Sequence, residues 1–149
     1  MKHSVPVSLL LHHKSPAMWS ISPEASVFEA IQLMAKKNIG SLLVMLNDKL
    51  VGLFTERDYA RKIVLHGKSS KETRVREVFT GEVITVTSHD SVEDCMKLMT
   101  EHRVRHLPVV DKGVTVGIVS IGDLVNWTIS VQDAQIAQME QYITGGTAS

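Results

Sequence analysis

Two motifs of equal spacing, one in each half of the chain, carry side chains suited to binding a phosphorylated ligand. They read Gly52-Leu53-Phe54-Thr55-Glu56-Arg57-Asp58 and Gly117-Ile118-Val119-Ser120-Ile121-Gly122-Asp123. Each motif is predicted to begin in a strand and to end in the first turn of a helix, where free backbone N–H groups attract phosphate. The motif hydroxyl can bond to the same phosphate. The motif aspartate, one helical turn later, can accept hydrogen bonds from two adjacent hydroxyls of a ribose.

A plain structural interpretation competes with this one. A Ser or Thr followed three residues later by an acidic residue is also the ordinary signature of a helix start. For either copy taken alone, a helix cap explains the pattern better than a ligand does. Two copies at equivalent points of the chain, each after an apolar strand that contains a glycine, favour a ligand. The glycine lets another group approach the backbone closely.

The two motifs end two copies of one longer segment. Ile21–Asp58 aligns with Val86–Asp123 without a gap, at a constant offset of 65 residues. Such a repeat predicts two similar units on a pseudo-two-fold axis, with two related clefts between them. Units this short are expected to bury surface against each other. The identical pairs are Ser26/Ser91, Val27/Val92, Leu33/Leu98, Met34/Met99, Leu42/Leu107, Val44/Val109, Val51/Val116, Gly52/Gly117 and Asp58/Asp123.

The hydrophobic pattern predicts the order strand, helix, strand, strand, helix in both units. In the first unit the elements are Met18–Ile21, a helix capped by Ser26 and ended by Asn38 and Gly40, Ser41–Leu46, Leu50–Thr55, and a helix from Glu56 to about Leu65. In the second they are Val83–Val86, Ser91–His102, His106–Val110, Thr115–Ser120 and Ile121–Thr128. Further helices are predicted within Ser4–Lys14 and, after a cap at Ser130, at Val131–Ile143, while Gly145–Ser149 is expected to fray.

Composition excludes several classes of protein. The 149 residues carry 16 Lys plus Arg and 16 Asp plus Glu, so no overall field favours nucleic acid or an anionic membrane. No apolar run approaches the roughly 18–20 residues of a membrane span. The one cysteine, Cys95, takes the place of Ala30 in a helical stripe and is predicted to be a small core residue. We therefore expect a cytoplasmic protein that binds neither nucleic acid nor membrane.

Catalytic and metal chemistry find little support. The seven histidines lack the spacing of metal ligands. The chain contains no G-x-S-x-G, no P-loop and no G-x-G-x-x-G motif, and no set of nucleophile and base is apparent. No catalytic residue, metal site or cofactor is predicted.

Together with the run Arg-His-Leu-Pro-Val-Val-Asp at Arg105–Asp111, the repeat and its two motifs resemble a cystathionine-β-synthase (CBS) domain pair. The resemblance covers about Met18 to Ile129. It implies an α/β (α+β) fold in which two pseudo-symmetric β-α-β-β-α repeats pack through their sheets, with flanking N- and C-terminal helices. The implied divisions are 1–17 for the N-terminal helix and linker, 18–66 and 81–130 for the repeats, 67–80 for the linker between them, and 131–149 for the C-terminal helix and tail.

The resemblance further implies two clefts that bind adenosine-containing ligands. The motif aspartate would hold the ribose, the motif hydroxyl would help to hold phosphate, and apolar strand residues would pack on the adenine. For the Asp58 cleft the expected residues are Thr55, Arg57, Asp58, Val83, Ile84, Arg105 and His106. For the Asp123 cleft they are Met18, Trp19, Ser20, Ile21, Gly40, Ser41, Ser120, Gly122 and Asp123, and Pro108 of the shared run is counted as a further ligand-binding residue.

We expect the two clefts to differ in their affinity for phosphate. Arginine binds phosphate through two parallel hydrogen bonds. The Asp58 cleft has Arg57 and Arg105, whereas the other has Gly122 in place of Arg57. The Asp58 cleft should therefore bind nucleotide phosphate more tightly. For Arg105 the alternative is a solvated surface charge, and for His106 a ligand contact and a structural role are equally open.

The expected function is that of a non-enzymatic regulatory module, a sensor of energy or redox state for a partner protein. AMP is the first expected ligand, and ADP, ATP and NAD(H) remain open. A homodimer through exposed helix faces, with added contacts from the terminal helix, is also implied by the resemblance. Two alternatives stay open at this point: an interaction or oligomerisation scaffold with vestigial clefts, and a small enzyme or metal-binding protein. The effector protein is not identified.

Overall fold

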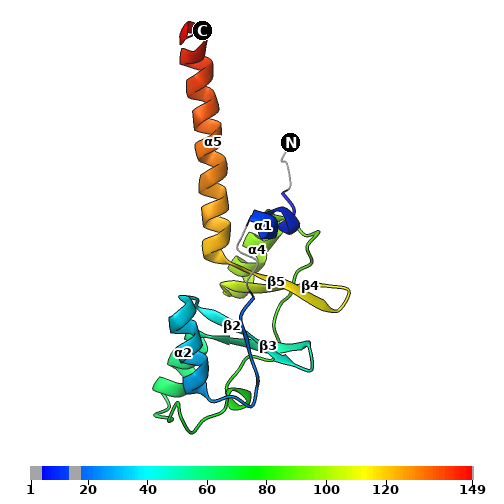
Figure 1. The fold of residues 1–149 in the computed structure, drawn as a ribbon, viewed down its shortest axis with the longest axis vertical. Coiled ribbons are helices and arrows are strands. Elements are labelled where there is room, and N and C mark those ends of the chain that lie inside the picture. The colour runs from blue at the N-terminus through cyan, green and yellow to red at the C-terminus, as the bar shows by residue number, and fades with distance from the viewer. Residues whose placement is uncertain (1–4, 14–17, 149) are drawn as a thin grey trace.

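A computed structural model describes residues 5–13 and 18–148, which form two similar α/β halves and one long helix that leaves them (Figure 1). The fold class predicted from the sequence is confirmed. The first half contains β1 (Ser20–Ile21), α2 (Val27–Lys37), β2 (Ser41–Leu46), β3 (Lys49–Thr55), α3 (Glu56–Asp58) and the π-helical η1 (Tyr59–Val64). The second contains α4 (Val92–His102), β4 (His106–Asp111), β5 (Val114–Ser120) and the start of α5 (Ile121–Ala148). A short helix, α1 (Val7–His13), precedes the first half, and a 3₁₀ turn, η2 (Val75–Glu77), lies between the halves.

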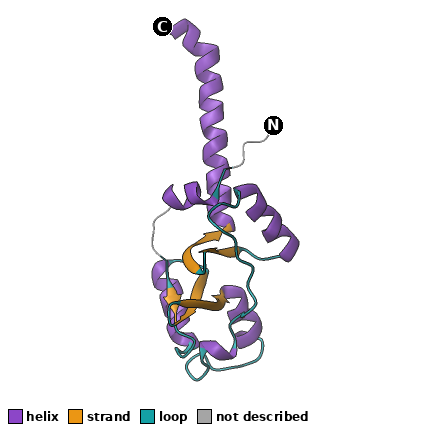
Figure 2. Ribbon diagram, turned by 90° about the vertical axis from the view of Figure 1, so that its right-hand side faces the viewer, coloured by secondary structure: helices purple, strands orange, loops and turns teal. Residues whose placement is uncertain are grey.

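The strands of the two halves form two small sheets that pack on each other. In the first sheet β1 runs parallel to β2, and β2 runs antiparallel to β3. The second sheet pairs β4 with β5 in the antiparallel sense, and β3 contacts β5 across the halves. Helices lie outside the strands, which occupy the middle of the molecule (Figure 2). The two hairpins are near copies, because their registers shift at equivalent points, after Val44 and after Val109.

Local sequence signals position the helix that opens each half. Ser26 and Ser91 are N-caps whose hydroxyls accept hydrogen bonds from Glu29 N (3.1 Å) and Asp94 N (3.0 Å). The cap at Ser26 was predicted, whereas Ser91 was predicted only as the first residue of its helix. Each hydroxyl satisfies a backbone donor that would otherwise lack a partner. The apolar face of each helix is buried, including Val27, Ala30 and Met34 in α2 and Val92, Cys95 and Met99 in α4.

Each half has its own hydrophobic core, and each core is completed by a segment from outside that half. Val75 and Val78, next to η2, are buried in the core of the first half. Val7 and Leu10, in α1, are buried in the core of the second half. The backbones match this exchange, since Val75 N donates to Ala25 O (2.9 Å) and Val7 N donates to Asp90 O (2.8 Å). We call Val5–Leu10 and Thr73–Val78 the crossing segments.

The strand predicted at Val83–Val86 is wrong, because only Val86 bridges to β4. The cause is Pro108. In the first half, Leu43 N donates to Trp19 O (3.2 Å) and extends the pairing of β1 with β2. Pro108 occupies the equivalent position in the second half and has no N–H to give to Ile84. The segment before Val86 therefore leaves the sheet.

Two predictions about helices also need correction. The helices predicted at Ile121–Thr128 and Val131–Ile143 are one continuous helix, α5, which also includes most of the tail that was expected to fray. Ser130 does not act as a cap, because no glycine or proline near it breaks the helix and a serine is tolerated inside one. The helix predicted from Glu56 to about Leu65 contains a π-helical turn, in which Leu65 N donates to Ala60 O (3.1 Å).

Candidate functional site

A cavity of about 510 Å³ opens at the junction of the two halves, and we call it the Asp58 cavity. One side comes from the end of β3 and from α3, the other from the segment before Val86 and the start of β4. Six residues expected at the Asp58 cleft therefore come together with Asp58 itself. The lining residues are Gly40, Leu53, Thr55, Glu56, Arg57, Asp58, Thr80, Glu82, Val83, Ile84, Val104, Arg105 and His106.

Thr55 and Asp58 are positioned by a capping box at the start of α3. The Thr55 hydroxyl oxygen accepts a hydrogen bond from Asp58 N (3.1 Å), and Asp58 Oδ2 accepts one from Thr55 N (3.0 Å). The helix-cap interpretation of the motif is thus correct for its geometry. The Thr55 side chain can still bind a ligand, because its hydroxyl keeps its own hydrogen as a donor.

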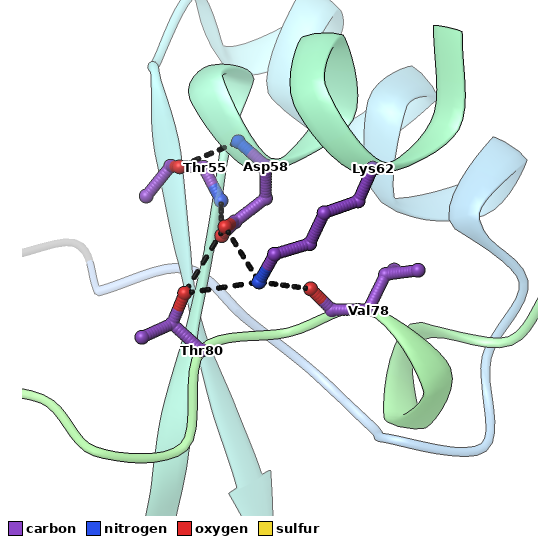
Figure 3. A network of polar contacts seen from close by, with 5 residues as sticks. All are labelled: Thr55, Asp58, Lys62, Val78 and Thr80. Carbon is purple, nitrogen blue, oxygen red and sulfur yellow. Dashed lines mark hydrogen bonds and ion pairs between the residues drawn. The ribbon is translucent and has the colours of Figure 1, made fainter. Parts of the chain in front are cut away.

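Asp58 has two further partners that the sequence did not reveal (Figure 3). The Thr80 hydroxyl donates to Asp58 Oδ1 (3.0 Å), and Lys62 Nζ forms an ion pair with the same oxygen (3.2 Å). Lys62 Nζ also donates to the carbonyl oxygen of Val78 (3.0 Å). Asp58 is 7% exposed, so this network holds a nearly buried carboxylate in place. The spacing of Asp58 and Lys62 is an i, i+4 pair that could have been recognised, whereas nothing local signals Thr80.

Basic groups and acidic groups share the rim of the Asp58 cavity. Arg57, Arg105 and His106 line it, as do Glu56 and Glu82. Arg57 Nη1 donates to the backbone oxygen of Arg103 (2.7 Å), so the first motif is tied to the end of α4 in the other half. The cavity therefore combines a carboxylate that accepts hydrogen bonds with two arginine side chains, one from each half.

The glycine of the first motif permits the close approach that was expected of it. A Cβ atom built on Gly52 would lie 2.3 Å from Thr80 O, which is closer than any side chain tolerates. Gly52 therefore lets the chain before Val86 pass directly over β3, where Leu53 N donates to Thr80 O (2.9 Å). This contact delivers the Thr80 hydroxyl to Asp58.

The second motif repeats the capping box of the first. Asp123 Oδ2 accepts a hydrogen bond from Ser120 N (2.9 Å), and Ser120 Oγ accepts one from Asp123 N (3.1 Å). Trp127 stands at the position equivalent to Lys62. Neither of the two cavities described here is lined by Ser120, Gly122 or Asp123.

The other residues expected at the Asp123 cleft are distributed over the first half. Met18 is exposed, and Ser20 and Ile21 form β1. Trp19 packs against the first core, with Lys37 Nζ 4.1 Å from its ring centroid. Ser41 is buried in β2. Gly40 lies on the Asp58 cavity instead, and Pro108 acts on the site through the backbone, as described above.

A second cavity of about 550 Å³ adjoins the first and was not anticipated from the sequence. Arg57, Val104 and Arg105 line both cavities. Its remaining wall lies between α4 and α5 and is mostly apolar, formed by Met96, Met99, Thr100, Arg103, Ile121, Leu124 and Val125.

Metal-ligating side chains do not gather into a site within residues 5–13 and 18–148. No cluster of three or more His, Cys, Asp or Glu side chains capable of holding a metal ion occurs there. Burial, with the nearby charges of Asp90 and Asp94, raises the pKa of the Cys95 thiol to about 11, as fits a core residue. Outside the cavities, the pKa of Asp111 is lowered by hydrogen bonds from the side chain and backbone of Ser88.

Known proteins share both the sequence and the fold. The CBS domain model matches residues 13–65 and 75–130. The mitochondrial CBS domain-containing protein CBSX3 of Arabidopsis thaliana is 40% identical over 135 residues, which cover 87% of this chain and 65% of that protein. The CBS domain-containing protein YhcV of Bacillus subtilis is 37% identical over 105 residues, covering 70% of this chain and 74% of YhcV. The solved structure of a candidate signal-transduction protein with CBS domains from Burkholderia ambifaria superposes with a TM-score of 0.82 at 47% identity, covering 85% of this chain and 95% of that one.

Location in the cell is not fixed by these relatives. No helix among the described residues has the length and apolar character needed to cross a bilayer. The Arabidopsis relative is mitochondrial, so the cytoplasmic location stays a prediction.

The family of the chain is shown by the two segments that match the CBS domain model. These segments span well over half of the sequence and coincide with the two structural repeats. This chain belongs to the CBS domain family and contains a tandem pair of CBS domains.

Proposed function

We propose that this protein is a non-enzymatic regulatory module that binds an adenine nucleotide in the Asp58 cavity and transmits that binding to a partner protein. AMP is the preferred candidate, and ADP, ATP and NAD(H) are the alternatives. The observation that carries the proposal is the meeting of Asp58, Thr55, Arg57 and Arg105 in one cavity built by both CBS domains. At about 510 Å³ it lies within the roughly 300–1,000 Å³ typical of small-molecule sites.

The carboxylate of Asp58 supports ribose binding. Its Oδ2 accepts one hydrogen bond, from Thr55 N, and can accept another from a ribose hydroxyl. Its Oδ1 already has Thr80 and Lys62 as partners. A second ribose hydroxyl must therefore displace or share with the Thr80 hydroxyl, which couples ligand binding to the segment that carries Thr80.

The charges around the cavity support a ligand with few phosphates. Arg57 and Arg105 can form charge-assisted hydrogen bonds with a phosphate, and the Thr55 hydroxyl can donate a further one. Glu56 and Glu82 line the same cavity and repel additional negative charge. This balance is the reason for preferring AMP to ATP.

The apolar part of the lining supports an aromatic base. Leu53 comes from β3, and Val83 and Ile84 come from the segment that Pro108 releases from the second sheet. A planar base between these side chains would bury apolar surface on both faces. Because the lining comes from both CBS domains, a bound nucleotide would favour one arrangement of the halves, and its preference sets the energy available for regulation.

The decisive experiment is a calorimetric titration with AMP, ADP, ATP, NAD and NADH, repeated on Asp58→Ala and on Asp123→Ala. Both variants lose the same side chain from matched capping boxes, but Asp58→Ala also loses the contacts to Thr80 and Lys62, so the melting temperature of each variant is measured first to verify folding. We expect adenine nucleotide to bind the wild-type protein, Asp58→Ala to lose at least about tenfold in affinity, and Asp123→Ala to lose less. Equal affinity in all three proteins would contradict the proposal.

A scaffold with vestigial clefts is the second candidate. One observation favours it: Ser120, Gly122 and Asp123 do not line either described cavity. Under that alternative, no nucleotide of the panel would raise the melting temperature, because only a ligand that binds the native state stabilises it.

A further inference from the structure

The last helix extends well beyond the body of the molecule. α5 contains 28 residues, which is about 42 Å at roughly 1.5 Å per residue. Its first turns are anchored, because Leu124 and Trp127 pack on the core of the second half. Figures 1 and 2 both show the rest of the helix standing away from the two sheets and the other helices.

One face of α5 carries a regular apolar stripe that is exposed along its length, although its first residue, Val125, also borders the second cavity. Val125, Ile129, Ile136 and Met139 are 48%, 48%, 53% and 63% exposed. With the exposed Gln132 they are spaced by four, three, four and three residues. This alternation is the 3.5-residue period of a coiled coil. We call these five residues the α5 seam.

We propose that the α5 seam pairs with the α5 seam of a second copy of this chain, in a parallel two-stranded coiled coil. This goes beyond the nucleotide-binding function and does not depend on it. In heptad terms Ile129 and Ile136 occupy a positions, and Val125, Gln132 and Met139 occupy d positions. Isoleucine at a favours two strands when the d residue is not β-branched, which holds for Gln132 and Met139.

Gln132 argues for an identical partner in parallel register. In that arrangement it faces Gln132 of the second copy, and the two amides can donate and accept hydrogen bonds between them. In an antiparallel pair or against another apolar helix it would face an apolar side chain, leaving a buried amide unsatisfied at a cost to stability. A polar residue at one such position is a known device for fixing register.

The charge of this region argues against a lipid surface as the occupant. No Lys or Arg follows Lys112 in the sequence. Helices that lie on anionic membranes carry Lys and Arg on their polar face, and α5 has none. A second uncharged seam is a better match.

Cysteine cross-linking of the full chain tests both the pairing and its direction. Gln132→Cys places a thiol in the seam, and Gln138→Cys places one outside the seam, about 120° around the same helix. Cys95, with no exposed surface, remains in both proteins and does not compete. On mild air oxidation with copper–phenanthroline, we expect rapid formation of a covalent dimer for Gln132→Cys and little for Gln138→Cys. Cross-linking that is equal in the two, or faster for Gln138→Cys, would overturn the proposal.

Sedimentation of charge variants tests whether the seam holds the dimer. Ile136→Glu with Met139→Glu puts two carboxylates into the seam, and Ala137→Glu with Gln138→Glu puts the same charges on exposed positions outside it. The seam variant should raise the dimer dissociation constant by about 100-fold or more, while the control stays near wild type. Equal melting temperatures for the two variants would verify that both are folded. A monomeric wild-type protein of 16.5 kDa, or a dimer that survives the seam substitutions, would show that the proposal is wrong.

Discussion

The ammonium group of Lys62 lies 3.2 Å from Oδ1 of Asp58, one helical turn away, and ties the motif aspartate to the backbone at Val78. The pair joins three parts of the chain, because Thr80 donates to the same carboxylate oxygen. Asp58 therefore has a structural role before any ligand arrives, and substitutions around it should affect both stability and binding.

Replacing Lys62 with methionine should destabilise the fold. Methionine keeps most of the apolar stem but leaves Asp58 Oδ1 with only the Thr80 hydroxyl as a partner. Lys62 is 41% exposed, so solvent screening limits the loss in the free energy of unfolding to about 1 kcal/mol. Urea denaturation measures it. Lys68→Met, which removes the same charge from an exposed residue, is the control, and a loss as large in the control would refute the role of the ion pair.

Arg105→Ala should weaken binding of AMP or ATP at the Asp58 cavity. The guanidinium group can supply two parallel charge-assisted hydrogen bonds, so we expect the dissociation constant to rise about tenfold and the effect to shrink at high salt. Isothermal titration calorimetry at two salt concentrations measures both. Arg76→Ala removes the same charge at an exposed position outside the cavities and should leave the isotherm unchanged. If Arg105→Ala titrates like wild type, Arg105 is only a solvated surface charge.

The two motif glycines should differ sharply in their tolerance of alanine. At Gly52 the new Cβ would lie 2.3 Å from Thr80 O and 2.4 Å from the Phe79 ring, so the backbone must move. At Gly117 it would lie 2.9 Å from Leu11 Cδ2, the end of a flexible side chain. We expect Gly52→Ala to cost about 3 kcal/mol or more of unfolding free energy and Gly117→Ala about 1 kcal/mol. Thermal or urea denaturation of both variants decides, and similar losses would contradict the packing described here.

Cys95 should make stability fall at alkaline pH. Its folded-state pKa of about 11 lies above the ordinary 9.0, so the folded protein keeps the thiol proton longer than the unfolded chain does. The contribution is present in full below pH 9 and is lost as the pH rises toward about 11, amounting to about 3 kcal/mol. Urea denaturation of wild type and Cys95→Ala across this pH range isolates the contribution of the thiol. Alanine is a suitable replacement because Ala30 occupies the equivalent position in the first half. Parallel pH profiles would contradict this assignment.

The parts of the site that follow from repetition could be predicted from the sequence. The offset between the repeats located Thr55 and Asp58, and the resemblance to a CBS pair placed Val83, Ile84, Arg105 and His106 on the same cavity, where the structure brings them together. The local cap at Ser26 was equally predictable, because its signal lies within one helical turn.

Features that differ between the two halves could not be predicted from the sequence. Pro108 removes one backbone donor and so releases the strand that was expected before Val86, an effect that appears only when the pairing partner is known. Thr80 reaches Asp58 because Gly52 lets the chain pass over β3, a relationship that no local pattern encodes. Ser130 matched a helix cap, yet nothing nearby stopped the helix, and propensity alone could not distinguish these cases.

The crossing segments make each CBS domain depend on the other for a complete hydrophobic core. Thr73–Val78 closes the hydrophobic core of the first half, and Val5–Leu10 closes that of the second. A cut in the connector near Ser69 would leave an amino-terminal piece that holds part of its neighbour's interior, and a carboxy-terminal piece that holds part of the other's. Such fragments should fail to fold singly and should reassemble when mixed. For this chain the smallest foldable unit is the pair.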